Sequence, residues 1–310
     1  MTIGIIGKNN DKGLGTLTRQ YLKFLPITHA VFVEDKRTKK DLKGTYCTRP
    51  EDHIPDVDVL IVLEMARPEL FKRCREKGIK TILKVNYEFL PERLEHEPDL
   101  YLCSSSLNYE AITSDNKVLI PDPVDLDEIA TRNRERCHTF VHNGGTLGVG
   151  GANGTQEVIE ALKYTSKPFS LILRAQVPIQ CHDPRVDLRI GSIPFTELYE
   201  EGDVFVLPQK FRATSLPLQE AMASGMPTLC SDIKPFNEYV TYTFPVHKYT
   251  EERLSRPIQY AHLDPKEIAK QLDALYDSDI LEASERAIEF GKSISWQSLA
   301  PKYIELCEKL

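Results

Sequence analysis

Residues 203–232 read DVFVLPQKFRATSLPLQEAMASGMPTLCSD, two short apolar runs separated by a longer segment of mixed character. The runs DVFVLP and PTLCSD are apolar almost throughout, which is typical of strands buried on both faces of a sheet. The segment between them is rich in small residues and carries one acidic side chain, Glu220, in a helix-like stretch. Two buried strands joined by a helix favour parallel pairing and predict an α/β fold.

The same alternation extends along the chain in both directions. Helix-period stretches cover residues 17–24 and 68–77, and a charged segment covers residues 122–136. The remaining strand candidates are TIGIIG, HAVFVE, VDVLIVL, KTILKV, DLYLCS and NKVLIP in the first half, then HTFVHNGG, FSLILRA and DLRIGS. We therefore predict two tandem Rossmann-like domains, residues 1–134 and 135–294. Ligands of such sheets bind at the carboxyl ends of the strands, which makes a cleft between the domains the expected site.

Composition and charge restrict the function classes. The chain has 310 residues, of which 41% are hydrophobic and 27% charged, as in soluble globular proteins. A formal charge of −7 argues against unspecific attraction to nucleic acid, although a local basic groove stays open. Seven cysteines without a C-x-x-C pair indicate reduced core thiols rather than a disulfide framework or a zinc site. With no apolar run of roughly 18 residues and no targeting segment, we expect a cytoplasmic protein.

Four ordered segments resemble one known family. They are KVLIPDPVDLDEI (117–129), IPFTELYEEGDVFVLP (193–208), SLPLQEAMASGMPTLCSDIKPFNEYV (215–240) and FGKSISWQSLAPKYIELCEKL (290–310). Together they resemble family 4 retaining glycosyltransferases of the GT-B architecture, in which two Rossmann-like domains face each other across a cleft. GIIGKNNDKGLGTLT (4–18) adds a looser match.

The resemblance implies a reaction and its partners. It implies a retaining, hexosyltransferase-like enzyme that takes a sugar from a nucleotide diphosphate sugar and needs no cofactor and no metal for chemistry. The acceptor is left open between a protein, a glycan, a small molecule and modified DNA, and the oligomeric state is left open too. A terminal helix, about residues 295–310, is expected to pack back on the first domain.

The resemblance also assigns a role to Glu220 and exposes a departure. A glutamate at this position begins a helix and accepts hydrogen bonds from the donor's ribose hydroxyls, for which an ionised carboxylate is well suited. The family has a second glutamate eight positions earlier, where this chain has Arg212. Arg212 then either meets a phosphate or an acidic sugar, or the sugar contact has moved elsewhere, or activity is weakened.

Phosphate binding is expected to rely on glycines. The segment VHNGGTLGVGGANGTQEVIEAL (141–162) lacks the arginine and lysine that the family commonly has there. Its glycines let backbone N–H groups approach a pyrophosphate, and a following helix adds a favourable dipole. A flexible surface loop is the alternative. The donor-binding candidates are Asn143, Gly144, Gly145, Thr146, Gly154, Arg174, Lys210, Arg212, Ser215, Leu216 and Glu220.

Acceptor-side candidates follow strands of the first half. Gly13 and Gly15 follow the first strand, where a tight structural turn explains them equally well. Asn86, Tyr87 and Glu88 follow the run KTILKV, where acceptor groups or a general base are expected. We take Glu88 and Arg212 as the catalytic candidates. Two rival functions stay open: a nucleotide-sugar or glycan-binding protein without turnover, and a sugar-nucleotide epimerase on the same fold.

Overall fold

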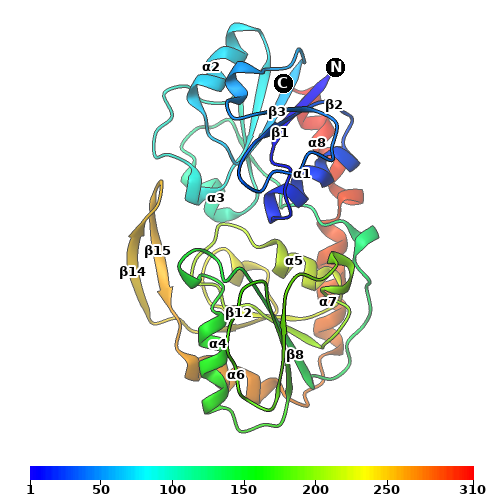
Figure 1. Ribbon diagram of the computed structural model, residues 1–310, viewed down its shortest axis with the longest axis vertical. Coiled ribbons are helices and arrows are strands. Elements are labelled where there is room, and N and C mark those ends of the chain that lie inside the picture. Colours follow the sequence, from blue (N-terminus) through cyan, green and yellow to red (C-terminus); the bar gives the residue numbers. More distant parts are fainter. The chain divides into compact units, whose positions relative to one another are not determined.

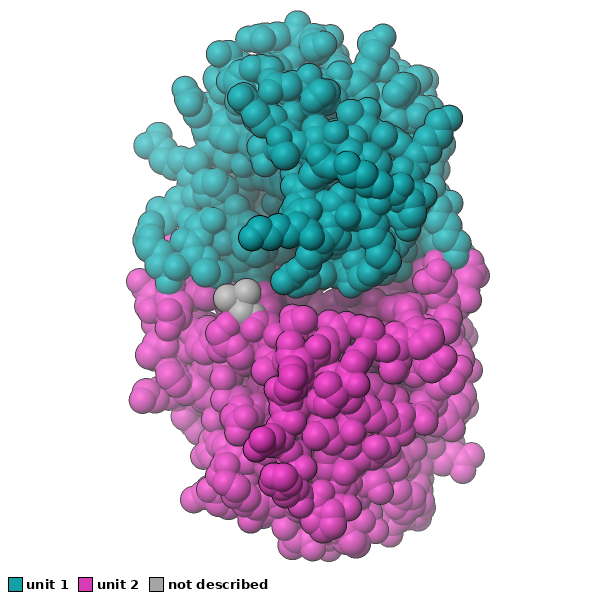
Figure 2. Space-filling view, in the orientation of Figure 1, with its two compact units in different colours: residues 1–123, 253–256, 296–310 teal, residues 124–252, 257–295 magenta. Residues whose placement is uncertain are grey.

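The computed structural model describes the whole chain apart from the side chain of residue 149. It divides into two compact units (Figure 2). Unit 1 comprises residues 1–123, 253–256 and 296–310, and unit 2 comprises residues 124–252 and 257–295. Each unit contains one parallel sheet with helices packed against it, so the predicted α/β class with two Rossmann-like domains is confirmed.

Unit 1 contains a seven-stranded parallel sheet in the order β3-β2-β1-β4-β5-β6-β7. Its strands are β1 (Ile3–Gly7), β2 (Ile27–Val33), β3 (Thr45–Cys47), β4 (Val59–Leu63), β5 (Lys80–Lys84), β6 (Leu100–Cys103) and β7 (Lys117–Leu119). Its helices are α1 (Gly13–Phe24), α2 (Pro68–Glu76), α3 (Ser106–Ala111) and α8 (Trp296–Glu308), with short 3₁₀ turns η1 (Pro50–Asp52) and η2 (Tyr87–Phe89) (Figure 1). Every residue of β4 is buried, which explains why its sequence is an unbroken apolar run.

Unit 2 contains a six-stranded parallel sheet in the order β10-β9-β8-β11-β12-β13. Its strands are β8 (Thr139–Gly145), β9 (Ser170–Ala175), β10 (Val186–Ile190), β11 (Val204–Val206), β12 (Thr228–Ser231) and β13 (Tyr242–Phe244), and a separate hairpin pairs β14 (Lys248–Arg253) with β15 (Pro257–His262). Its helices are α4 (Thr155–Ala161), α5 (Leu216–Ala223), α6 (Pro265–Leu275) and α7 (Leu281–Ser293), with 3₁₀ turns η3 (Leu126–Glu128), η4 (Val149–Gly151), η5 (Leu162–Tyr164), η6 (Phe195–Glu197) and η7 (Phe236–Glu238).

The division between the units lies at residues 123 and 124, not near the predicted residue 134. The charged composition of residues 122–136 suggests a linker, but most of this segment packs into unit 2. Arg134 is buried, and its guanidinium donates hydrogen bonds to the carbonyls of Arg132, Tyr199, Gly202 and Ser224 at 2.7–3.1 Å. The sequence alone does not distinguish a buried arginine that donates to backbone carbonyls, such as Arg134, from an arginine exposed to solvent.

Helix α8 completes the core of unit 1. Trp296 is fully buried, stacks on Phe24 with ring centroids 5.2 Å apart, and meets Tyr21 edge-on at 5.0 Å. Its indole Nε1 donates a hydrogen bond to Gln20 Oε1 at 3.0 Å. The last helix of the chain therefore packs against α1, the first one.

Two properties of the described residues bear on the function classes. All seven cysteines are free thiols, and six of them are buried, as the sequence predicts. None of the described helices has the length and apolar character that crossing a bilayer requires.

Candidate functional site

A glycine-rich loop follows β8 at the carboxyl end of the unit 2 sheet. Between the end of β8 and the start of α4, Gly145, Gly148, Gly150, Gly151 and Gly154 all have positive φ, between 53° and 74°. A side chain at Gly154 would also place its Cβ 2.2 Å from the Pro208 carbonyl oxygen. These conformations and close approaches suit glycine and keep backbone groups accessible to a ligand.

Buried side chains fix the base of this loop. The His142 ring is fully buried, with Nδ1 at 2.8 Å from the Val206 carbonyl oxygen and Nε2 at 2.8 Å from Thr155 Oγ1. Burial lowers the pKa of His142 to about 4, so the ring is neutral at physiological pH. Both ring nitrogens are occupied, and His142 ties β8 to β11 and to the start of α4.

Two predicted cations lie against the loop. Arg212 Nη2 is 2.9 Å from the position that a Cβ on Gly148 would take, and Lys210 Nζ is 3.9 Å from the corresponding position on Gly151. Lys210 also forms an ion pair with Glu157 at 2.7 Å. The structure thus brings together the glycines and both cations from the segment after β11. Thr146, also in the loop, is exposed.

Arg174 differs from the other two cations. Its side chain is largely buried in β9, where the guanidinium pairs with Glu201 at 2.8 Å and donates to the Leu198 carbonyl at 3.0 Å. Burial lowers its pKa from the usual arginine value. A further bond, 3.3 Å long, runs from Arg174 Nη1 to Asn143 Oδ1. Arg174 therefore orients the side-chain amide of Asn143, which lies near the end of β8.

Glu220 lies in α5 but does not begin it. The helix starts at Leu216, and Glu220 is one turn further along. The positive end of the helix dipole therefore stabilises the Glu220 carboxylate less than the sequence predicts. The carboxylate is buried and accepts a hydrogen bond from Tyr199 Oη at 2.6 Å. Burial raises the pKa of Glu220 to about 7, opposed by the bond from Tyr199. The group is therefore close to half-ionised at neutral pH.

Several buried polar atoms of unit 2 have no hydrogen-bond partner among the described residues. Buried polar atoms are paired in most folded proteins, so a group of exceptions indicates a place where a ligand or water completes the bonding. Sequence patterns do not reveal such atoms, because the missing partner is apparent only in the folded chain. They include Asn143 Nδ2, Glu157 Oε2, Arg174 Nε, Gln209 Oε1, Ser215 Oγ and Gln219 Oε1.

The acceptor-side candidates lie in unit 1. Tyr87 and Glu88 form η2 after β5, and Asn86 precedes them. Gly13 begins α1, and a Cβ on Gly15 would lie 2.0 Å from the Asn10 carbonyl oxygen. That close approach gives Gly15 a structural role, the alternative that its sequence position already offered.

A charged cluster beside Asn86 was missed from the sequence. Lys84, at the end of β5, is 1% exposed and pairs with Glu64 at 2.9 Å and Asp122 at 3.2 Å. Although burial alone lowers the pKa of Lys84, these two carboxylates raise it above the usual value. Glu64 has φ of 60° and also accepts from Asn86 Nδ2 at 3.2 Å. The available signal was a lysine inside the apolar run KTILKV, which requires buried partners.

No group of three or more His, Cys, Asp or Glu side chains in the described part of the chain is arranged to hold a metal ion.

Comparisons with known proteins agree with this arrangement. Residues 178–278 match the family model for glycosyl transferases group 1, a segment that includes Lys210, Arg212 and Glu220. No curated protein sequence matches the chain.

Solved structures of similar fold span the whole chain. The lipopolysaccharide outer core galactosyltransferase WaaB is 14% identical with a TM-score of 0.68, and the alignment covers 100% of both chains. HepE of Anabaena, solved with UDP and glucose, is 11% identical with a TM-score of 0.70 over 100% of both chains. The sucrose-phosphate synthase of Thermosynechococcus elongatus is 14% identical with a TM-score of 0.65, covering 100% of this chain and 98% of that one. The resemblance to glycosyltransferases is confirmed by the group 1 family model, and the chain shares the GT-B fold of these structures.

Proposed function

We propose that the protein is a retaining glycosyltransferase that moves a sugar from a nucleotide diphosphate sugar to an acceptor hydroxyl. The observation that supports this best is in unit 2. There the glycine loop, Arg212 and Lys210 lie together, and the segment that supplies both cations also supplies the buried carboxylate of Glu220. Glycine N–H groups and cations bind a diphosphate, and a carboxylate binds the paired hydroxyls of a ribose.

The bond changes define what the site must do. The bond between the sugar C1 and the diphosphate oxygen breaks, and its electron pair stays on that oxygen. Backbone N–H groups and Arg212 stabilise the negative charge that develops there, which is where preorganised donors contribute most to catalysis. The acceptor oxygen bonds to C1 on the same face of the sugar and loses its proton to a base. Our candidate for this base is Glu88. This chemistry uses no cofactor and no metal.

Incubation with a panel of nucleotide sugars, followed by product analysis, tests the proposal. We expect slow hydrolysis of one donor even without an acceptor, because water replaces the acceptor hydroxyl. Interconversion of two nucleotide sugars would instead show an epimerase.

Binding without turnover is the second candidate, and one contact favours it. The Lys210 ammonium is already paired with Glu157 at 2.7 Å, so part of the positive charge at the loop is neutralised within the protein. In the same panel, this candidate predicts a rise in melting temperature with a nucleotide sugar and no product.

Glu220 gives the first mutational prediction. Glu220→Ala should weaken nucleotide diphosphate binding by about 1–3 kcal/mol, the range for losing hydrogen bonds to a charged group. Isothermal titration calorimetry measures this loss. Unchanged affinity in a folded variant would contradict the assignment of Glu220 to the ribose.

The raised pKa of Glu220 adds a pH dependence. The ionised carboxylate accepts two hydroxyl bonds, so affinity should increase as the pH rises through about 7. The diphosphate titrates as well, and Glu220→Gln is the matched control because its amide does not titrate. The ratio of wild-type to Glu220→Gln affinity isolates the carboxylate. Conversely, Glu220 stabilises the ligand-free fold below its ordinary carboxyl pKa, and this contribution is lost as the pH rises through about 7.

Arg212 gives the second prediction. If Arg212 binds the diphosphate, Arg212→Ala should weaken binding of a nucleoside diphosphate much more than binding of the nucleoside. Added salt should shrink the difference by screening the charge. Lys163→Ala removes an exposed positive charge from the same unit and serves as the control.

Arg212→Glu distinguishes two hypotheses for the arginine that replaces the family's glutamate: that Arg212 binds the diphosphate, and that it weakens activity. It reverses the charge beside the diphosphate while it supplies the carboxylate that the family has at this position. We expect lower affinity and lower turnover. A gain in transfer would show instead that the arginine impairs the enzyme.

A further inference from the structure

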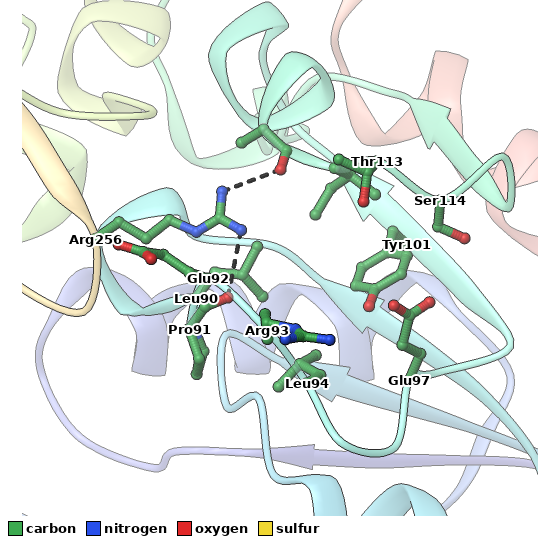
Figure 3. Close-up of a pocket in the computed structure, with 12 residues that line it drawn as sticks. Leu90, Pro91, Glu92, Arg93, Leu94, Glu97, Tyr101, Thr113, Ser114 and Arg256 are labelled. Carbon is green, nitrogen blue, oxygen red and sulfur yellow. Dashed lines mark hydrogen bonds between the residues drawn. The ribbon is translucent and has the colours of Figure 1, made fainter.

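A polar pocket lies in unit 1, apart from the cluster around Glu64. Its volume is about 230 Å³, and its lining comes from residues 90–97, Tyr101 of β6, residues 111–114 and Arg256 (Figure 3). Two of the lining segments lead into β6 and β7, whereas Glu64 and Asn86 follow the ends of β4 and β5. The pocket is therefore a separate feature of the unit.

The pocket contains a tyrosine hydroxyl with no partner in the protein. The Tyr101 residue is 3% exposed, but its Oη is open to the pocket and forms no hydrogen bond with any described residue. Burial raises its pKa above the usual tyrosine value, so the hydroxyl keeps its proton and can donate. Leu90 and Ile112, both buried, add apolar wall beside the ring. A ligand here meets a mostly polar lining that includes one unused hydroxyl and a small apolar area.

The charges around the pocket balance. Arg93 and Arg256 are cationic and Glu92 and Glu97 are anionic, so the lining carries no net charge. Glu92 is paired with Arg253 at 2.9 Å, whereas Arg93 and Glu97 form no ion pair with other described residues. Figure 3 shows the side chains of Tyr101 and Glu97 facing the same part of the pocket. Unused donors and acceptors without net charge suit a neutral ligand that carries several hydroxyls.

Arg256 gives the pocket a fixed wall. Its guanidinium donates hydrogen bonds to the carbonyls of Ala111 at 3.0 Å and Pro91 at 3.3 Å, and it lies 5.4 Å from the centre of the Tyr87 ring. These bonds join the end of α3 to the loop at Pro91, as the dashed lines in Figure 3 show. A wall held in this way is formed before a ligand arrives, which reduces the entropy lost on binding.

We propose that this pocket binds one neutral sugar residue. A sugar ring carries many hydroxyls that both donate and accept and has small apolar C–H faces. This matches a mostly polar lining with the Tyr101 hydroxyl, Glu97 and Arg93, beside the apolar side chains of Leu90 and Ile112. The volume is below the roughly 300 Å³ at which pockets for drug-sized ligands begin, which limits the ligand to about one ring. The proposal does not depend on the reaction proposed for unit 2.

Titration with neutral monosaccharides, followed by protein NMR, tests the proposal. The full chain is titrated with glucose, galactose, mannose and N-acetylglucosamine, and with their methyl glycosides. We expect at least one sugar to shift signals of residues 90–114, with saturation. Equal binding of a free sugar and its glycoside indicates a free monosaccharide, and preference for the glycoside indicates the end of a glycan. A panel in which no sugar shifts these signals overturns the proposal.

Variants locate the binding site. Tyr101→Phe removes only the hydroxyl, and since that hydroxyl has no protein partner the fold should keep its stability. Affinity for the sugar should fall about 3- to 10-fold, the effect of losing one hydrogen bond. Tyr109→Phe, at a partly exposed tyrosine of α3, is the matched control and should leave affinity unchanged.

Glu97→Gln should also weaken binding, whereas Glu220→Ala should not. Sugar affinity that is unchanged in both Tyr101→Phe and Glu97→Gln, or that is lost in Glu220→Ala, would place the sugar elsewhere and overturn the proposal.

Discussion

Trp296→Ala is expected to lower the free energy of unfolding of unit 1 by about 3–5 kcal/mol, the usual cost of removing a buried tryptophan side chain. The indole is fully buried, stacks on Phe24, meets Tyr21 edge-on and donates to Gln20. Its loss leaves a cavity between α8 and α1 and an unpaired Gln20 oxygen. The melting temperature should drop by roughly 6–20 °C for a unit of this size.

Calorimetry, combined with hydrogen exchange to assign the transition to unit 1, measures the loss. Trp296→Phe keeps an aromatic ring and should cost much less, and Phe89→Ala, at a half-exposed phenylalanine, should cost little. Deletion of the chain from Ser295 onward should have a larger effect than Trp296→Ala, because it also exposes the apolar residues that α8 covers. A deleted chain that melts like the intact one would show that α8 does not stabilise unit 1.

Lys84→Met is expected to cost a similar amount, about 3–5 kcal/mol, because it breaks a buried ion-pair cluster from one side. Methionine fills most of the space of the lysine stem, so the loss arises from charge rather than volume. Glu64 and Asp122 are left close together without their cation. Urea unfolding at neutral pH measures the effect.

A second substitution distinguishes a charge effect from a packing effect. Adding Asp122→Asn to Lys84→Met removes one of the two facing carboxylates, so the double variant should recover part of the stability at neutral pH. A double variant that is no more stable than Lys84→Met would assign the loss to packing.

The sequence predicts the sheets well because their strands are buried on both faces. Every quoted apolar run is a strand in the structure, from TIGIIG in β1 to PTLCSD in β12. The edge strand β3 was missed because it has only three residues and follows a long charged stretch, so it shows no apolar run. The hairpin of β14 and β15 was missed as well, since it lies outside both large sheets and β14 is largely exposed.

The site is less predictable because its properties depend on contacts between distant residues. The sequence shows the glycine loop as a cluster of glycines. It does not show that Arg174 binds Glu201 and Asn143 within the protein. Glu220 is conspicuous in the sequence, yet its raised pKa depends on burial and on Tyr199, twenty-one residues earlier. The division between the units was misplaced for the same reason, because the burial of Arg134 in unit 2 depends on contacts with distant residues.

The three-segment make-up of unit 1 has a consequence for protein synthesis. Its aromatic core joins residue 24 to residue 296, and its pocket wall includes residue 256. At about 5–20 residues per second, a ribosome needs roughly 15–60 s to make these 310 residues. During most of that time Tyr21 and Phe24 have no tryptophan to cover them. The first half of the chain, although synthesised first, therefore finishes folding last, and a nascent chain that stalls before α8 presents an aromatic surface to chaperones.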